Sequence, residues 1–118
     1  MKSKFESKYF TDLEQRETLS GRFRSNQKSV FKKYEYKNKA VYLGEWKGGF
    51  RHGKGTMEWP DGAKYEGSWE FGQAVGEGKF LHADGDIYEG QWYNNKANGK
   101  GVYLNSKGAK YEGDWRED

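Results

Sequence analysis

Few side chains of this sequence are suited to catalysis or metal binding, because it contains only two histidines, His52 and His82, and no cysteine. Two imidazoles that lay side by side could bind a metal ion or transfer a proton. The histidines stand at non-equivalent positions of a repeated segment, however, so the repeat gives no reason to bring them together. The lack of cysteine excludes disulfides, thiolate metal sites and cysteine nucleophiles. We therefore predict no catalytic residue, no metal site and no cofactor, and we interpret both histidines as solvated or packing residues.

Two further patterns have a chemical interpretation and a simpler one. Glu66, Glu89 and Glu112 recur at a constant spacing and could form a ladder of cation ligands. Carboxylates along one strand face also keep sheets from aggregating, and we favour this second interpretation. The Gly-Lys-Gly segments at 53–55 and 99–101 suggest a phosphate-binding loop, but each lacks the following helix and the spacing of a P-loop. Neither pattern predicts a ligand.

The elements that position these residues follow a repeat of 23 residues. Residues 42–64, 65–87 and 88–110 align without insertion or deletion, and residues 111–118 begin a fourth copy. Each copy begins with Tyr-x-Gly-x-Trp and, where complete, has a turn glycine near its end. The first set of columns contains Tyr42, Gly44, Trp46, Tyr65, Gly67, Trp69, Tyr88, Gly90, Trp92, Tyr111, Gly113 and Trp115, and the turn glycines are Gly62, Gly85 and Gly108.

Each repeat has the local signals of a β-hairpin. Alternate residues of a strand lie on one face, so Tyr-x-Gly-x-Trp places two rings on the same face with a glycine between them. The Asp-Gly pairs at 61–62 and 84–85 predict turns, because such a pair between extended segments is typical of hairpins. Between residues 69 and 78 we expect a wider hairpin loop with two glycines. Successive hairpins then add edge to edge.

Composition favours the same all-β architecture. Only 33% of residues are hydrophobic and 18% are aromatic, so rings must supply most of the buried surface. We expect antiparallel strands in sequential order, with almost no helix after residue 20. The expected strands cover residues 41–47, 54–60, 63–70, 77–83, 86–93, 100–106 and 109–115.

The Tyr-x-Gly-x-Trp strand, the glycine loop, the Gly-x-Gly segment and the Asp-Gly turn, at this period, resemble the MORN repeat (membrane occupation and recognition nexus) over residues 42–118. The resemblance implies an elongated, single-sheet antiparallel meander of about three and a half hairpins that scaffolds other proteins. MORN proteins are linked to cilia, parasite cytoskeletons, membrane junctions and lipid kinases. We therefore expect a non-enzymatic scaffold in a larger assembly, with a cytoskeletal or ciliary setting favoured. The repeat-face columns named above pack the sheet and form a candidate groove for a protein partner.

The segment before the repeats follows the pattern more loosely. Residues 19–41 align with the repeat in degenerate form, and we interpret them as a divergent capping repeat that protects the sheet edge. Residues 1–18 form a basic arm, in which a possible capping box at Thr11 and Glu14 predicts a short helix through about Thr18. So short a helix must dock to persist. Its candidate docking residues are Phe5, Tyr9, Phe10 and Leu13.

Charge is divided unevenly between the arm and the repeats. Residues 1–41 contain eleven Lys or Arg and five Asp or Glu, a net charge of +6, whereas residues 42–118 contain ten and thirteen, a net charge of −3. Candidate contacts with an anionic surface are Arg22, Arg24, Lys28, Lys32 and Lys33. Two alternatives to the scaffold stay open: a peripheral module that binds anionic phospholipid through the arm, and a targeting fragment of a larger enzyme.

Other protein chains are the expected partners, with at most weak binding to anionic lipid. We expect no nucleic acid, because an acidic body follows the basic arm, and no small-molecule substrate. The sequence contains no apolar run near the ~20 residues that span a membrane, and its N-terminus lacks the apolar region of a signal peptide. These features predict a cytoplasmic location.

Overall fold

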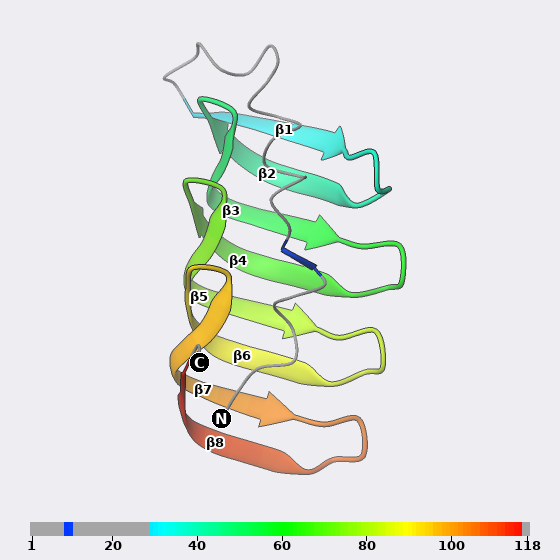
Figure 1. Cartoon of the computed structure of the whole chain (residues 1–118), viewed down its shortest axis with the longest axis vertical. Coiled ribbons are helices and arrows are strands. Elements are labelled where there is room, and N and C mark those ends of the chain that lie inside the picture. The colour runs from blue at the N-terminus through cyan, green and yellow to red at the C-terminus, as the bar shows by residue number, and fades with distance from the viewer. Residues whose placement is uncertain (1–8, 11–28, 117–118) are drawn as a thin grey trace.

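The computed structural model describes residues 9–10 and 29–116, and nearly all regular structure in this part of the chain is β-strand. Eight strands form one antiparallel sheet in the order β1 to β8, so that each strand pairs with its neighbours in sequence (Figure 1). The all-β, single-sheet meander expected from the sequence is confirmed. The strands are β1 (Val30–Glu35), β2 (Val41–Lys47), β3 (Phe50–Glu58), β4 (Lys64–Glu70), β5 (Gln73–Leu81), β6 (Ile87–Tyr93), β7 (Lys96–Leu104) and β8 (Lys110–Trp115).

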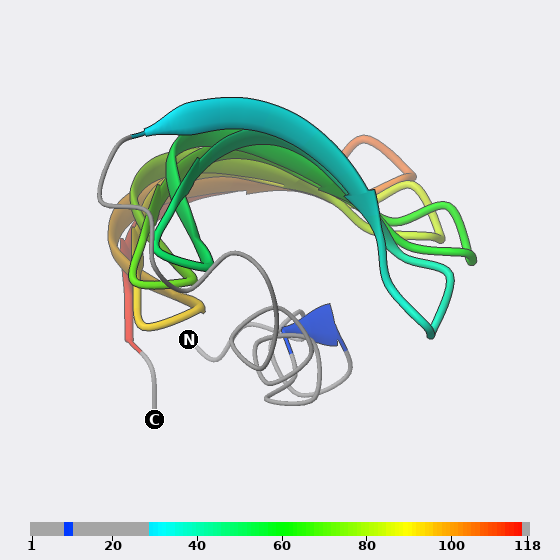
Figure 2. The same cartoon turned by 90° about the horizontal axis from the view of Figure 1, so that it is seen from above.

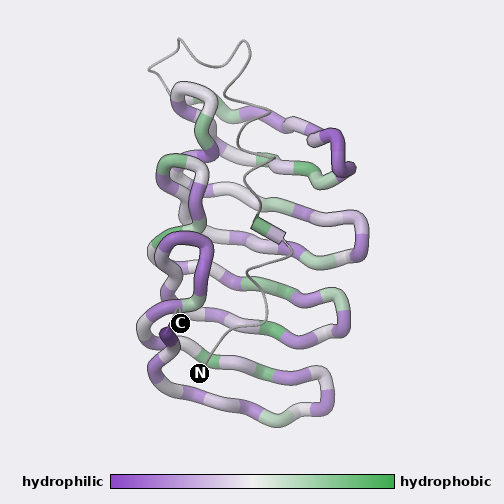
Figure 3. The backbone as a smooth tube through the Cα atoms, in the orientation of Figure 1, coloured by the Kyte–Doolittle hydropathy of each residue, from purple (hydrophilic) through white to green (hydrophobic). Residues whose placement is uncertain are grey.

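The sheet is elongated and curved. The molecule measures 45 × 25 × 23 Å along its principal axes, and the hairpins add along the longest one (Figure 1). Seen along that axis, the strands bend so that one face of the sheet is concave and the other convex (Figure 2). Hydrophobic and hydrophilic residues interleave along the strands (Figure 3), as they must where only one face is apolar. The core therefore lies on the concave side.

The prediction of a wide loop between residues 69 and 78 was wrong. β4 and β5 are joined by a two-residue turn, in which Phe71 has a φ of 50° and Gly72 a φ of 80°. Two consecutive residues with positive φ make the tight hairpin turn that matches strand twist. The pairing register then shifts between Gly67 and Trp69, and this bulge accommodates the residues that the sequence suggested would form a loop. As a result β5 begins at residue 73, four residues earlier than expected.

The Asp-Gly pairs lie in turns at the opposite ends of the strands, as predicted. Between β3 and β4, the amide of Gly62 donates to the carbonyl of Trp59 at 3.0 Å, and Gly62 has a φ of 95°. The Asp61 Oδ1 atom accepts the amide of Ala63 at 3.0 Å, which closes the turn from the side chain. Asp84 Oδ1 accepts the amide of Asp86 at the same separation in the next repeat. These turns form one rim of the concave face.

The N-terminal region contributes to both the edge and the inside of the sheet. β1 belongs to the predicted capping repeat and pairs with β2, with Lys32 opposite Gly44 and Tyr34 opposite Tyr42. Tyr9 and Phe10 lie on the concave side of the sheet (Figure 2). The predicted helix at residues 11–18 and two of its docking residues, Phe5 and Leu13, lie outside the described residues. Within residues 9–10 and 29–116, no helix is long and apolar enough to cross a membrane.

Candidate functional site

The concave face carries a continuous row of rings, here called the aromatic ladder. Successive ring centroids are 4.9 to 5.4 Å apart and the rings meet edge to face, at interplanar angles of 76 to 87°. This geometry is favourable for aromatic pairs. The row exists because each repeat places its tyrosine between its own tryptophan and that of the next repeat. In order, the ladder is Trp46, Tyr42, Trp69, Tyr65, Trp92, Tyr88 and Trp115.

Main-chain carbonyls hold the polar atoms of the ladder. Each ladder tryptophan donates its Nε1–H to the carbonyl 14 residues earlier, at 3.0 to 3.2 Å. Each ladder tyrosine donates its hydroxyl to the carbonyl three residues later, at 2.9 to 3.1 Å. In the central repeat, Trp69 donates to Gly55 and Tyr65 donates to Ser68. Because these donors are satisfied within the sheet, the ladder presents mainly carbon to the concave side.

The ladder tyrosines do not serve as acids or bases near neutral pH. Burial raises the pKa of Tyr88 to about 12, and burial also raises the pKa of Tyr42 and of Tyr65 well above the ordinary value of 10.0. All three side chains are fully buried. Their hydroxyls therefore stay neutral, and the ladder is a packing and contact surface rather than a proton-transfer site.

Paired glycines make room for each ladder tyrosine. In the central repeat, Gly67 of β4 lies opposite Gly78 of β5. A Cβ atom added to Gly78 would lie 2.2 Å from the hydroxyl oxygen of Tyr65, so the ring crosses directly over this glycine. A Cβ atom added to Gly67 would lie 2.5 Å from the Cα of Gly78. The other two complete repeats have the same arrangement with Gly44 and Gly55, and with Gly90 and Gly101.

The fourth, partial copy of the pattern is packed differently. Tyr111 is 49% exposed, although the equivalent tyrosines are fully buried. A Cβ atom added to Gly113 would meet nothing within 4 Å. Trp115 is nevertheless buried, because it contacts Tyr88 of the preceding repeat at 5.3 Å. Of the predicted repeat-face residues, Tyr111 and Gly113 therefore take no part in the packing of the ladder.

Tyr9 occupies the middle of the concave face. Its side chain is 2% exposed, and its hydroxyl donates to Asp61 Oδ2 at 2.8 Å. Its main-chain carbonyl accepts the Nε1–H of Trp59 at 3.0 Å. Its ring lies 5.1 Å from that of Trp59 and 5.2 Å from that of Phe80. This residue is thus held through its ring, its hydroxyl and its backbone.

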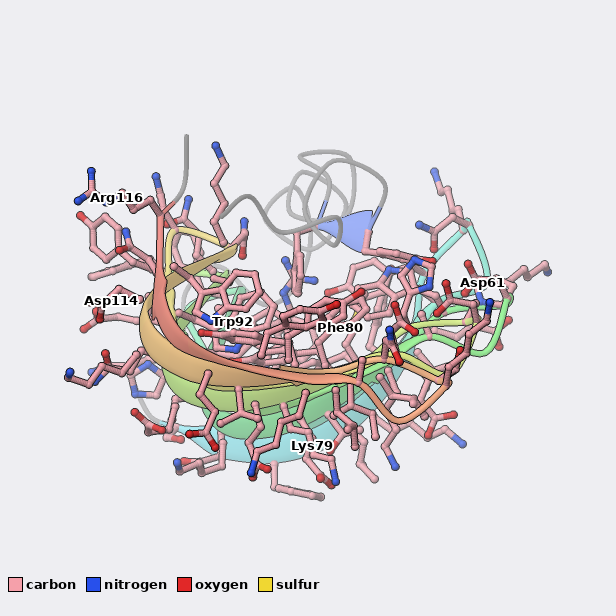
Figure 4. The ribbon with its side chains drawn as sticks, turned by 90° about the horizontal axis from the view of Figure 1, so that it is seen from below. Asp61, Lys79, Phe80, Trp92, Asp114 and Arg116 are labelled. Atoms are coloured by element: carbon pink, nitrogen blue, oxygen red, sulfur yellow. The ribbon has the colours of Figure 1, made fainter. Side chains whose placement is uncertain are left out.

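Phe10 lies beside it on the ladder itself. Its ring centroid is within 6.0 Å of five other ring centroids, and all five contacts are edge to face or tilted. Figure 4 shows Phe80 and Trp92 pointing into the concave side and Asp61 at its rim. We call the residues that receive Tyr9 and Phe10 the aromatic cup. They are Trp59, Asp61, Tyr65, Trp69, Phe80 and Trp92.

Half of the cup was not among the predicted site residues. Phe80 lies on the concave side because strand alternation continues past Gly-x-Gly, so the residue two positions after the second glycine faces the same way. The corresponding residues in the other repeats are Met57 and Tyr103. A large apolar residue in this column was the signal that pointed to Phe80. Trp59 and Asp61 lie between the end of β3 and the start of β4, and no such column pointed to them.

Arg51 was also missed. It is 2% exposed, and its guanidinium lies 4.6 Å from the ring centroid of Trp69. Its Nη2 donates to the carbonyl of Gly72 at 2.7 Å. The equivalent positions in the next two repeats are Ala74 and Ala97, so a charged residue among alanines was the available signal. Arg51 therefore adds a buried cation beside the ladder.

The residues with possible metal or acid–base chemistry are not assembled into a site. His52 lies in β3 opposite Glu45, whereas His82 follows β5 and lies edge-on to the ring of Tyr9 at 5.8 Å. Across residues 9–10 and 29–116, no three histidine, aspartate or glutamate side chains are placed to share a metal ion. The lysines of the Gly-Lys-Gly segments, Lys54 and Lys100, lie within β3 and β7 rather than before a helix.

The repeated glutamates lie on the convex face, where one lysine separates two of them. Lys79 is directly opposite Glu66 on β4 and Glu89 on β6, and Figure 4 shows it pointing to the convex side. Glu112 forms an ion pair with Lys110 at 2.8 Å. Of the candidate anionic contacts, Lys32 and Lys33 are exposed on β1. Arg22, Arg24 and Lys28 lie outside the described residues.

Hairpins that add edge to edge around an aromatic concave face define a β-hairpin repeat protein. The MORN repeat family matches residues 42–64, 65–87 and 88–110, with the same boundaries as the repeats found in the sequence. The chain belongs to the MORN repeat family. No curated protein matches it. Membership identifies a repeat module of a kind often involved in protein or membrane interactions.

Proposed function

We propose that the chain is a non-enzymatic scaffold whose concave face binds an extended segment of another protein. The observation that carries this proposal is the binding of Tyr9 and Phe10 in the aromatic cup. These two residues come from a part of the chain far from the repeats in sequence, yet Tyr9 is 2% exposed. A face that binds two aromatic side chains of its own N-terminal segment has the surface needed to bind two aromatic side chains of a partner.

The cup combines a wide apolar surface with few polar groups that fix orientation. Trp59 donates to the backbone of the bound segment, and Asp61 accepts its tyrosine hydroxyl. Such a combination is typical of sites that read an extended peptide by its backbone and by alternate side chains. The partner segment is therefore one with a tyrosine followed by an aromatic residue, and it competes with Tyr9 and Phe10 for the cup.

For the setting, we propose a cytoplasmic assembly associated with the cytoskeleton or the cilium. This part of the proposal rests on the MORN family alone. A fluorescently tagged chain that localises to neither structure in ciliated cells would contradict it.

A peptide added in trans tests the binding proposal. The probe is a labelled peptide of residues 4–15, measured by fluorescence anisotropy against the wild-type chain and against the double variant Tyr9→Ala/Phe10→Ala. We expect saturable binding to the double variant and at least about tenfold weaker binding to the wild type, because a tethered segment competes at an effective concentration in the millimolar range. The matched control peptide carries alanine at the positions of both aromatic residues.

Two outcomes would contradict the proposal. One is a double variant that keeps its far-UV circular dichroism but does not bind the probe. The other is tight binding of the wild-type chain to anionic vesicles at ~0.15 M salt that is lost when Arg22, Arg24 and Lys28 are changed to glutamine, since basic residues near such a surface contribute about 1 kcal/mol each. The second outcome would favour the lipid-binding alternative.

A further inference from the structure

Residues 47–50, 70–73 and 93–96 form three tight turns on the side of the sheet opposite the Asp-Gly turns, and we call them the tight-turn rim. They stand in a column along the longest axis (Figure 1). Glycine and asparagine tolerate a positive φ, whereas a bulky residue with a positive φ is an outlier. The central pairs of the turns, all with positive φ, are Gly48-Gly49, Phe71-Gly72 and Asn94-Asn95. Phe71 therefore stands where its residue type is disfavoured.

Phe71 is also exposed to solvent. It is 71% exposed, and its ring meets that of Phe50 edge to face at a centroid distance of 5.8 Å. Tyr93, at the next tight turn, is 61% exposed. The ring of Phe71 thus gains little from burial, although its backbone is strained. A strained backbone and an exposed aromatic ring at one residue indicate a contact surface for another molecule.

Arg51 holds the turn that carries Phe71. Its main-chain carbonyl accepts the amide of Gly72 at 3.1 Å, and its Nη2 donates to the carbonyl of Gly72 at 2.7 Å. The guanidinium is buried against Trp69, so the turn is fixed to the concave core. A side chain presented on a rigid support loses less conformational freedom on binding, which favours Phe71 as an anchor of an interface.

The main chain of the rim is already hydrogen-bonded, which disfavours a partner strand. Besides the two bonds of Gly72, the amide of Asn95 donates to the carbonyl of Ala74 at 3.1 Å, and Asn95 Oδ1 accepts the amide of Ala74 at 2.7 Å. A partner strand would need open main-chain groups along an edge. The rim instead presents side chains, which suits an α-helix because the main chain of a helix is satisfied internally.

The spacing of the turns matches a helix that runs along the rim. Two strands at ~4.8 Å separate one tight turn from the next, so successive turns are about 10 Å apart. Seven residues of an α-helix rise about 10.5 Å. One apolar residue of such a helix can therefore cover Phe71, and the apolar residue seven positions away can cover Tyr93. Residues three and four positions apart lie on the same face and fill the space between them.

Basic side chains lie beside the rings at both ends of this surface. Lys47 is directly opposite Phe50, and Lys96 is directly opposite Tyr93. Acidic residues of a partner complement these lysines. A second copy of the chain does not, because two rims related by a two-fold axis would bring Lys47 near a second Lys47 or near Lys96.

We propose that the tight-turn rim binds an amphipathic α-helix of a partner protein. Apolar residues seven positions apart cover Phe71 and Tyr93, and acidic residues beside them face Lys47 and Lys96. Phe71 is the anchor of this contact. No side chain of this surface belongs to the aromatic cup, so the rim can fail to bind a helix while the cup binds its extended segment, and the reverse.

A display library of helical peptides is the probe, and the full 118-residue chain is the receptor. The library has a framework of alanine, glutamate and lysine, about 18 residues long, and is randomised along one face of the helix. We expect the selected peptides to have apolar residues at positions i and i+7 with Asp or Glu beside them. Their binding should shift the amide resonances of the tight-turn rim and leave those of the aromatic cup unchanged.

Phe71→Asn is the matched variant, because Asn94 occupies the same turn position with a φ of 57°. We expect the variant to bind the selected peptides at least about tenfold more weakly than the wild type. Its melting temperature should be equal to that of the wild type or higher, because asparagine tolerates this backbone conformation. A variant that melts at a lower temperature would show that Phe71 serves folding instead, and would overturn the proposal.

Further outcomes would also overturn it. One is a selection that yields no peptide whose binding depends on Phe71, and another is a set of selected peptides that stay non-helical when bound, as measured by far-UV circular dichroism. Binding to phosphatidylserine-containing vesicles at ~0.15 M salt that Phe71→Asn abolishes would assign the rim to a membrane surface. A concentration-dependent dimer that the same substitution abolishes would assign it to a second copy of the chain.

Discussion

The concave and convex faces of the sheet are built by the same strands, yet they are held together by different interactions. On the concave face, rings meet at 4.9 to 5.4 Å and their polar atoms donate to main-chain carbonyls within the sheet. On the convex face, exposed lysine and glutamate side chains face one another across strands, as Lys79 faces Glu66 and Glu89. The alternation of side chains along each strand is what separates the aromatic residues from the charged ones.

Because of this difference, the concave face contributes most of the stability, and the convex face contributes mainly to solubility. Burying an aromatic ring removes a large apolar area from water, whereas an exposed ion pair contributes little because water and salt screen it. The concave face also contains Tyr9 and Phe10, so it links stability to binding. The charges on the convex face oppose the stacking of two molecules through that face. Substitutions on the two faces should therefore differ severalfold in their effect.

The largest expected effect is that of Trp69→Ala. Trp69 is 2% exposed and contacts Tyr42, Tyr65 and Phe10, so its removal leaves a cavity in the centre of the ladder. We expect a loss of roughly 3 to 5 kcal/mol in the free energy of unfolding, measured by urea denaturation. Trp115→Ala is the matched control and should cost less, because repeat stability depends on neighbours and Trp115 lies at the end of the ladder. Equal losses would contradict this account.

Phe10→Ala is expected to have a smaller effect on the same face. Phe10 contacts the ladder but is only partly buried, and the sheet beneath it keeps its own hydrogen bonds. We expect a loss of about 2 kcal/mol, below the full range for buried aromatic residues. Tryptophan fluorescence gives a second measurement, since Trp59, Trp69 and Trp92 become more exposed. A variant with unchanged stability and unchanged emission would show that Phe10 does not cover the ladder.

Most of this fold follows from the sequence because the repeat specifies it many times. The period, the Tyr-x-Gly-x-Trp alternation and the Asp-Gly turns predicted one antiparallel meander. The first strand of each repeat was placed to within a residue. The sequence also singled out Tyr9 and Phe10 among four docking residues, on the argument that a short helix at residues 11–18 persists only if it docks. Both residues do pack on the sheet.

What the sequence did not reveal has physical causes in particular residues. The tight turn at Phe71 requires a positive φ in a non-glycine residue, which is uncommon, so the glycines around it suggested a loop. The position of Asp61 in the cup depends on the approach of Tyr9 from 52 residues away, and no local pattern contains that contact. Arg51 is a buried charge that lies before residue 54, where the expected strand began, so its place in β3 beside Trp69 was not predicted.

Alkaline pH should weaken the concave face in particular. Tyrosine ionises near pH 10 in the unfolded chain, whereas burial raises the pKa of Tyr88 to about 12 and that of Tyr42 and Tyr65 also upward. Protons therefore leave the unfolded state first, so stability is full below about pH 10 and falls as the pH rises beyond it. Thermal melting between pH 8 and 11 measures this fall. In Tyr88→Phe the fall should be shallower, and an identical slope would show that Tyr88 does not contribute.

The smallest expected effect belongs to the convex face. Lys79→Glu would put a third carboxylate between Glu66 and Glu89, and like charges directly opposite each other on neighbouring strands are unfavourable. We expect a loss of about 0.5 to 1 kcal/mol at low salt, reduced by most of its value at ~1 M salt, where the Debye length is roughly 3 Å. The matched control Lys79→Gln has the same length without the repulsion and should lie near the wild type. Urea denaturation at both salt concentrations gives the comparison. If Lys79→Glu cost as much as Trp69→Ala, or if salt left its effect unchanged, the two faces would not differ in the way that their side chains indicate.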